Sequence, residues 1–218
     1  MPTLRQACML GLSCLAMTTA SHAEMFGGVE FPQGVSSFAD AVKSYDPVVA
    51  ATGPTAPNSI PALSIGAPDY NGGTGEYVSL GDGGSITLQF VDNRLTGSGS
   101  NAFDLWIFEV GPDVEDTFVE ISMDGINYTA VGKVFGATSG IDIDAFGFDQ
   151  SDLFRFVRLT DDGSEGQQAG ASVGADIDAV GAISSVVAPP PAIPEPETYA
   201  LMLAGLAAVA VAARRRRR

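Results

Sequence analysis

Apolar and polar residues alternate over several short stretches between residues 24 and 187. SITLQFV, residues 85–91, and FVEISM, residues 118–123, each place apolar side chains at every second position. A period of two is typical of strands with one buried face. FDLWIFEV, residues 103–110, is apolar almost throughout and predicts a strand covered on both faces. LFRFVRLT, residues 153–160, has apolar residues on both faces, so its orientation stays open.

Turn residues separate these stretches. Asp124-Gly125 lies between VEISM and INYTAVGKV and predicts a hairpin, because Asp and Gly tolerate positive φ. Glycine-rich segments begin at Asn71, Gly81 and Thr96 and predict loops. No amphipathic helix of about twelve residues is evident, although short helical turns near 37–42 and 150–153 stay open. The pattern predicts an all-β fold, a β-sandwich of jelly-roll type, over residues 24–187.

The amino-terminal segment has a different pattern. Arg5 precedes a short apolar run, and Ser21-His22-Ala23 has the small-x-small form of a cleavage site. These features predict a secretory signal peptide over residues 1–23, cut after Ala23. A first transmembrane helix is the alternative, which the short apolar run disfavours. Cleavage there would leave a body without cysteine or histidine.

The carboxyl-terminal segment is also distinct. Residues 188–197 form a proline-rich linker, residues 198–213 carry no charge, and residues 214–218 are all arginine. Sixteen uncharged residues make a helix of about 24 Å, short of a hydrocarbon core of about 30 Å. We expect a single transmembrane helix over 198–213, a transient anchor in the inner membrane with its arginines on the cytoplasmic side. A core helix of a soluble protein is the alternative.

Charge and residue types narrow the function. The net charge is −15, and residues 24–188 hold only five basic side chains: Lys43, Arg94, Lys133, Arg155 and Arg158. Such a body would be repelled by nucleic acid, so no nucleic-acid partner is expected. Without histidine or cysteine, the usual Ser-His and Cys-His catalytic systems are excluded, and zinc and haem lose their commonest ligands. Any metal would be a hard cation held by oxygen.

The carboxyl-terminal elements resemble a known signal. Pro194-Glu195-Pro196, an apolar helix and terminal arginines, in that order, resemble the PEP-CTERM sorting signal of Gram-negative bacteria. The resemblance implies processing by an exosortase near this motif, followed by delivery to the cell surface or an exopolysaccharide matrix. The same segment also resembles one labelled "ice-binding protein C-terminal domain". The body has no ladder of regularly spaced threonines, so ice binding is not expected.

The body carries a second resemblance. VEISMDGINYTAVG, FRFVRLTD and DIDAVGAI follow one another in the order seen in discoidin-like, galactose-binding β-sandwiches. The chain is similar, too, to uncharacterised surface proteins with the same kind of tail. The first resemblance implies a sandwich that often holds a structural calcium ion. A fold reused this widely does not fix a function.

Acidic clusters are the candidate metal ligands. Asp161, Asp162 and Glu165 follow one predicted strand, and Asp176 and Asp178 open another. If the two strands meet at one end, their carboxylates could bind Ca²⁺; a solvated loop is the alternative.

The segment IDIDAFGFDQSDL invites comparison with an EF-hand. Asp142, Asp144 and Gly147 have the spacing of loop positions 1, 3 and 6. Phe146 and Leu153 would occupy two further ligand positions and cannot ligate, so an EF-hand is not expected.

Aromatic and acidic residues suggest carbohydrate as the ligand. Four aromatic candidates could stack on sugar rings, namely Trp106, Tyr70, Tyr77 and Tyr128, although Trp106 is expected in the core. A glycosidase needs two paired carboxylates, and the spacing of Glu109, Glu115 and Glu120 singles out no pair. We expect a non-enzymatic surface protein that binds polysaccharide or Ca²⁺. A polysaccharide-active enzyme and a purely structural surface protein are the alternatives.

Overall fold

The computed structural model describes residues 22–49, 53–110, 114–165, 170–188 and 196–215. By their contacts, the residues divide into two compact units, Met1–Val187 and Ala188–Arg218. Among the described residues, the regular elements of the first unit are strands and short 3₁₀ turns, and that of the second is helix α1, at Pro196–Arg215. Each unit is described below by itself.

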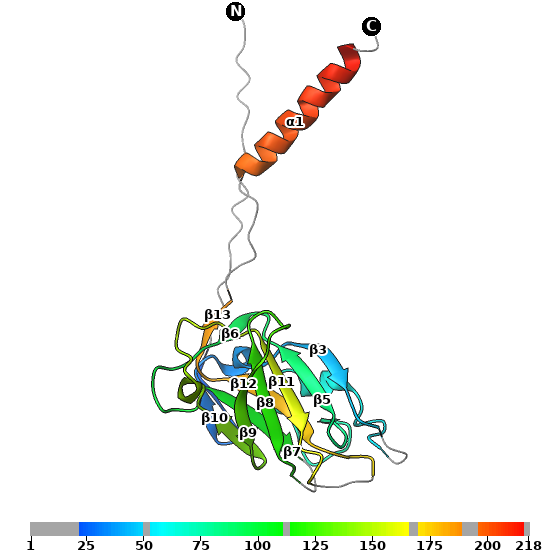
Figure 1. Ribbon diagram of the computed structural model, residues 1–218, viewed down its shortest axis with the longest axis vertical. Coiled ribbons are helices and arrows are strands. Elements are labelled where there is room, and N and C mark those ends of the chain that lie inside the picture. The colour runs from blue at the N-terminus through cyan, green and yellow to red at the C-terminus, as the bar shows by residue number, and fades with distance from the viewer. Residues whose placement is uncertain (1–21, 50–52, 111–113, 166–169, 189–195, 216–218) are drawn as a thin grey trace, which may run out of the picture. The chain divides into compact units, whose positions relative to one another are not determined.

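Two antiparallel sheets face each other in the first unit (Figure 1). One has the order β10-β7-β12-β4: Thr138–Ile141, Leu105–Val110, Asp176–Ala182 and Val78–Ser79. The other has the order β3-β5-β11-β8-β9: Ala41–Asp46, Ser85–Gln89, Phe156–Asp161, Thr117–Ser122 and Thr129–Val134. The body is therefore a β-rich sandwich. Its jelly-roll topology and discoidin-like origin stay predictions, because unrelated families share the sandwich architecture.

Smaller elements complete the first unit. Two short two-stranded sheets pair β1 with β2 and β13 with β6: Glu24–Phe26, Val29–Phe31, Ser185–Val187 and Asn93–Leu95. Three 3₁₀ turns connect strands, η1 at Gly34–Ser37, η2 at Pro61–Ser64 and η3 at Asp144–Phe146. Residues 37–42, considered for a helical turn, instead lead from η1 into β3, and residues 150–153 form no helix. Ala23, after which the predicted signal peptide would be cut, lies directly before β1. Residues 1–21 of that predicted peptide lie outside the described residues.

The alternating stretches form the core between the two sheets. Ile86, Leu88 and Phe90 are each 0% exposed, and Val119 and Ile121 lie in the same cluster. The predicted apolar faces of these strands are confirmed, except that Met123 lies beyond β8 and is exposed. Thr87 and Ser122, predicted on the other face, are also buried. β11 buries Val157 and Leu159 in this core, which resolves its orientation.

β7 is covered on both faces, as its continuous apolar sequence predicts. Leu105 and Ile107 point into the main core. On the other face, Phe108 packs with Phe31 and Phe38, its ring centroid 6.0 Å from each of theirs. This aromatic cluster covers the face of β7 that points away from the main core. The strand therefore carries apolar residues at successive positions.

The β8–β9 connection confirms the predicted Asp124-Gly125 hairpin. Gly125 has φ of 72°, a conformation that favours glycine. Asp124 accepts hydrogen bonds from the backbone N–H groups of Ile126 and Asn127, each at 2.8 Å. The two strands pair antiparallel on either side of the turn.

Candidate functional site

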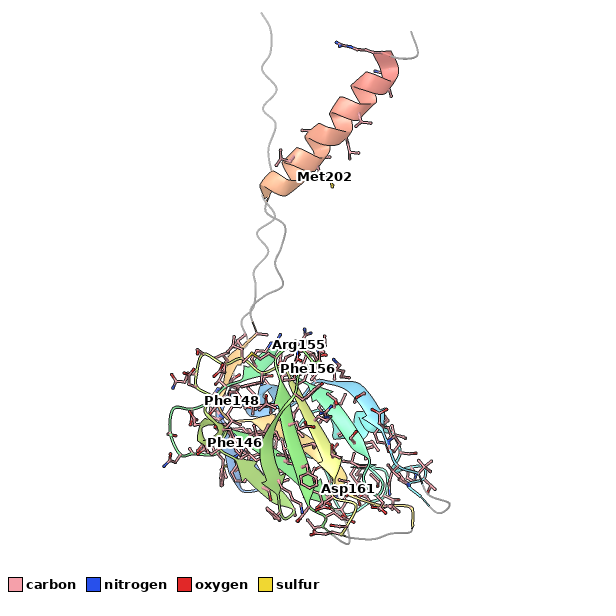
Figure 2. The ribbon with its side chains drawn as sticks, viewed as in Figure 1. Phe146, Phe148, Arg155, Phe156, Asp161 and Met202 are labelled. Carbon is pink, nitrogen blue, oxygen red and sulfur yellow. The ribbon has the colours of Figure 1, made fainter. Side chains whose placement is uncertain are left out.

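The five acids predicted to bind calcium lie at one end of the sandwich but do not converge on one point. Asp161 ends β11, at the end opposite Arg155 and Phe156 (Figure 2). Its carboxylate accepts hydrogen bonds from Gly83 N at 2.8 Å and Ala175 N at 2.7 Å. The bond from Ala175 links the two sheets, because Ala175 directly precedes β12, which lies in the sheet opposite β11. Asp161 is 3% exposed and has a structural role that its sequence position did not indicate.

Asp162 and Glu165 lie in a different environment, around a lysine. Lys133 Nζ lies 2.6 Å from Asp116 Oδ2, 2.5 Å from Asp162 Oδ2 and 3.8 Å from Glu165 Oε1. Oxygens of these three acids lie within 4.8 Å of one another. We call this group the Lys133 cluster: Lys133, Asp116, Asp162 and Glu165. The ammonium already occupies the centre where a cation would bind, and its hydrogen bonds lower the pKa of Asp162.

Asp176 and Asp178 are buried on the other sheet, each 3% exposed or less. Asp176 accepts a hydrogen bond from the Ser79 hydroxyl. Burial raises the pKa of Asp176 to about 7, and nearby Glu115 adds to the rise. Asp178 occupies the β-bulge where the register between β12 and β7 shifts. A bulge redirects a side chain, and here the Asp178 carboxylate faces Asp69 N at 3.3 Å and Tyr70 N at 3.4 Å.

Glu109 lies beside these aspartates and is 1% exposed. Its Oε1 accepts a hydrogen bond from Asp176 N at 3.2 Å. Burial raises the pKa of Glu109 to about 9, and the charges of Glu115 and Asp176 contribute. At neutral pH the Glu109 carboxyl is therefore protonated. Glu120 is different, since it pairs with Arg158 across β8 and β11 on the other sheet.

A cavity of about 360 Å³ opens next to Asp178. Strands β1, β7 and β10 and the segment before β4 form its walls. Aromatic, acidic and backbone groups share the lining, chiefly Phe26, Tyr70, Phe108, Glu109, Asp178 and Thr138. We call it the Tyr70 cavity. Aromatic faces and two carboxyl groups, those of Glu109 and Asp178, converge on this one space.

The remaining aromatic candidates are placed elsewhere. Tyr128 stacks on the Arg158 guanidinium, whose central carbon lies 4.1 Å from the ring centroid. Tyr77 is 3% exposed, and its hydroxyl lies 2.7 Å from Ser172 Oγ. Trp106 is half-buried against the aromatic cluster and lines a second cavity, of about 310 Å³, with Phe103 and Phe135. Tyr70 is thus the aromatic candidate that shares a cavity with an acid predicted as a ligand.

The second unit contains helix α1. Pro196, the last residue of the predicted Pro194-Glu195-Pro196 motif, begins the helix; Pro194 and Glu195 lie outside the described residues. Leu201, Leu203 and Leu206 are exposed, and Arg214 and Arg215 occupy the last turn. Basic side chains are favourable there because the carboxyl end of a helix carries partial negative charge.

The predicted membrane span over residues 198–213 is not supported. Among the described residues, no helix combines the length and the apolar character that crossing a membrane requires. The run is short, and small alanine side chains make up much of it.

Comparison with known proteins identifies the carboxyl-terminal segment. A family model described as the PEP-CTERM protein-sorting motif matches residues 192–218. These residues are a sorting motif. The match includes the predicted motif residues, the whole of α1 and the terminal arginines, and it indicates exosortase-dependent sorting of an exported protein. No curated protein matches the chain.

The PEP-CTERM motif covers the tail alone, so the chemistry of the body depends on its own geometry. Sequence reasoning missed Asp116, Phe26 and the position of Asp178 in a bulge. Asp116 directly precedes β8 and Asp162 directly follows β11, and the pairing of these two strands, which are far apart in the sequence, brings the two acids together. Phe26 belongs to a three-residue strand, too short for an alternating pattern to reveal it.

Proposed function

We propose that this exported protein is delivered to the cell surface or an exopolysaccharide matrix, where its sandwich binds polysaccharide without catalysing a reaction. The PEP-CTERM motif supports the delivery, with exosortase processing near Pro194-Glu195-Pro196. The Tyr70 cavity supports the ligand class. The acidic body, with a chain net charge of −15, suits a neutral ligand better than an anionic one.

The chemistry of the cavity fits a sugar ring. Tyr70 is 37% exposed, so part of its ring is available for stacking against the C–H groups of a sugar. The Asp178 carboxylate accepts two long backbone hydrogen bonds and retains lone pairs for a sugar hydroxyl. A cavity of about 360 Å³ is at the lower end of the range typical of small-ligand sites. This juxtaposition of ring and carboxylate is the observation that carries the proposal.

Polysaccharide cleavage is a second candidate, favoured by one observation. Glu109 and Asp178 line the same cavity, and burial raises their pKa values to about 9 and about 6. A protonated carboxyl beside an ionised one is the arrangement of a glycosidase. Against it, Glu109 is 1% exposed and its Oε1 already accepts the Asp176 amide proton. Binding is therefore the better supported function.

Binding to a polysaccharide array, including exopolysaccharide from the producing bacterium, tests the proposal. Tyr70→Ala and Asp178→Asn should each weaken binding by about tenfold, since each removes one contact of about 1.4 kcal/mol. Phe135→Ala is the matched control, because this exposed ring lies outside the Tyr70 cavity and should leave binding unchanged.

Two outcomes would change the conclusion. Release of reducing ends by the native chain, abolished in Glu109→Gln, would establish cleavage in place of simple binding. Absence of binding to every polysaccharide would favour a purely structural surface protein.

A further inference from the structure

Three aspartates from two segments that are distant in the sequence lie close together at one end of the β7–β10 pair. Asp104 directly precedes β7, and Asp142 directly follows β10. Because Ile141 pairs with Leu105 in antiparallel register, the next residues outward, Asp142 and Asp104, come opposite each other. Asp144 follows in η3. One carboxylate oxygen from each aspartate lies within 4.8 Å of the other two. We call this group the Asp104 cluster.

Asp104 is the most constrained member. It is 0% exposed, and it accepts a hydrogen bond from Ile143 N through Oδ2 at 2.9 Å. Its Oδ1 is buried and makes no hydrogen bond of ordinary geometry to any described residue, although the Ser184 and Ser98 hydroxyls interact with this carboxylate. Asp142 Oδ1 is likewise buried, with no hydrogen-bond partner among the described residues. Leaving one buried carboxylate oxygen unsatisfied costs free energy, and two in one cluster point to a missing positive partner.

Asp144 is the third member of the Asp104 cluster. Its carboxylate accepts hydrogen bonds from Ser98 N at 2.8 Å and Gly99 N at 3.0 Å. The Ser98 hydroxyl lies 3.2 Å from the same carboxylate and adds a neutral oxygen. The neighbouring Phe146 and Phe148 mark this side of the sandwich in Figure 2. Asp144 is thus held in place by backbone groups while facing two other acids.

Among the described residues, no basic side chain pairs with these three acids. None of the ion pairs among the described residues includes Asp104, Asp142 or Asp144. The Lys133 cluster shows how the same protein treats an otherwise similar trio, with an ammonium in contact with all three acids. The two clusters therefore differ in charge balance. In the Lys133 cluster an ammonium contacts the three acids, whereas the Asp104 cluster has buried carboxylate oxygens and no ion pair among the described residues.

We propose that Asp104, Asp142 and Asp144 form a Ca²⁺ site. Carboxylate oxygens are the ligands that hard divalent cations prefer, and calcium accepts irregular sets of six to eight oxygens. Three aspartates, the Ser98 hydroxyl and water molecules would supply that set. Mg²⁺ fits less well, because it demands a near-ideal octahedron and two of the aspartates, Asp104 and Asp144, are fixed by separate backbone bonds.

This site differs from the EF-hand that the sequence excludes. Asp142 and Asp144 would be ligands in both, but the third carboxylate comes from Asp104, far away in the sequence. A bound ion would join the segment before β7 to the segment after β10. The Phe103 ring, adjacent to Asp104, packs edge-on against Trp106, with ring centroids 5.4 Å apart. An ion bound to Asp104 would therefore also restrict the motion of this aromatic pair. The proposal does not depend on the Tyr70 cavity.

Calcium titration of the purified full-length chain, after treatment with a chelator, tests the site. Calorimetry should show about one equivalent of Ca²⁺ bound with a Kd below about 1 mM, the range of extracellular calcium modules. The melting temperature should rise with Ca²⁺ and much less with Mg²⁺. Asp142→Asn should weaken binding by about tenfold or more. Asp104→Asn should do the same, and Asp142→Asn remains informative if the buried Asp104→Asn variant does not fold.

Asp116→Asn is the matched control, because it removes one acid from the other trio. It should bind Ca²⁺ as the native chain does. The proposal is overturned if the native chain shows no calcium response, if Asp142→Asn responds like the native chain, or if Asp116→Asn is the variant that loses the response. A lost polysaccharide interaction with intact calcium binding would contradict the proposed function alone.

Discussion

The Lys133 cluster and the Asp104 cluster have the same number of acids in similar proximity, yet their charge balance differs. In both, oxygens from three carboxylates lie within 4.8 Å of one another. Lys133 contacts all three acids of its cluster, whereas no ion pair among the described residues involves the Asp104 cluster. A count of acids therefore does not identify a metal site. What distinguishes the two is whether a protein cation already satisfies the oxygens.

The largest expected effect concerns a third group of acids, the buried Glu109, Asp176 and Asp178. Burial raises the pKa of Glu109 from 4.5 to about 9, so the folded chain binds more protons than the unfolded chain between these values. The free energy of unfolding should therefore fall as pH rises through this window, by up to about 1.4 kcal/mol per pH unit for this one group. Glu109→Gln should flatten the profile, measured by urea unfolding.

Two other buried acids allow a check on this dependence of the unfolding free energy on pH. Asp176 and Asp178, with pKa values raised to about 7 and about 6, should leave a residual slope in Glu109→Gln. Glu30→Gln, at an exposed position in β2, serves as the control and should keep the native profile. An unchanged profile in Glu109→Gln would mean that this carboxyl is not protonated in the folded chain.

The next largest effect should come from removing the ammonium from the Lys133 cluster. Lys133→Met keeps an unbranched side chain near the rings of Phe118 and Phe135 but leaves three acids without a cation. The variant should melt at a lower temperature in metal-free buffer and regain part of the loss in Ca²⁺. Calorimetry should detect a calcium equivalent that the native chain lacks. If no such calcium equivalent is found, three neighbouring acids are not sufficient for Ca²⁺ binding. The buried oxygens of the Asp104 cluster would then be the feature that a calcium site requires.

Single replacements in the two clusters should have opposite signs in metal-free buffer. Asp116→Asn removes a partner of Lys133 and should lower the melting temperature by roughly 2 °C. Asp142→Asn relieves repulsion among three acids and should raise it by a similar amount. Differential scanning calorimetry of the two variants beside the native chain measures both shifts. Shifts of the same sign would remove the distinction between the clusters.

The smallest effect is that of salt. At about 1 M ionic strength the screening length is about 3 Å, so interactions among partly exposed charges weaken. Both shifts, the decrease in Asp116→Asn and the increase in Asp142→Asn, should become smaller in 1 M NaCl. Shifts that salt leaves unchanged would indicate changes in packing, not in electrostatics.

Local patterns predicted several parts of the fold correctly. The alternation in residues 85–91 gave the buried face of β5, and the continuous apolar run at 103–110 gave a strand covered on both sides. Asp124-Gly125 predicted the β8–β9 hairpin. These features depend on neighbouring residues, so a single sequence contains the necessary information.

The candidate sites were predicted less well, because their residues come together only through strand pairing. Asp161, Asp162, Glu165, Asp176 and Asp178 were grouped by proximity in the sequence, whereas the structure distributes them among backbone amides, Lys133 and a β-bulge. The Asp104 cluster depends on the register of β7 with β10, two strands that are not adjacent in the sequence. Register follows from packing, which no local pattern records.

By itself, the sequence determined where this protein is sent. The PEP-CTERM motif is a linear signal, read from a proline-flanked glutamate, an apolar helix and terminal arginines that are continuous in the chain. The tertiary structure alone decided which acids contact Lys133 and which are buried with raised pKa values. The physical reason is that a carboxylate's state depends on its burial and on charges a few ångströms away, and those neighbours are set by folding.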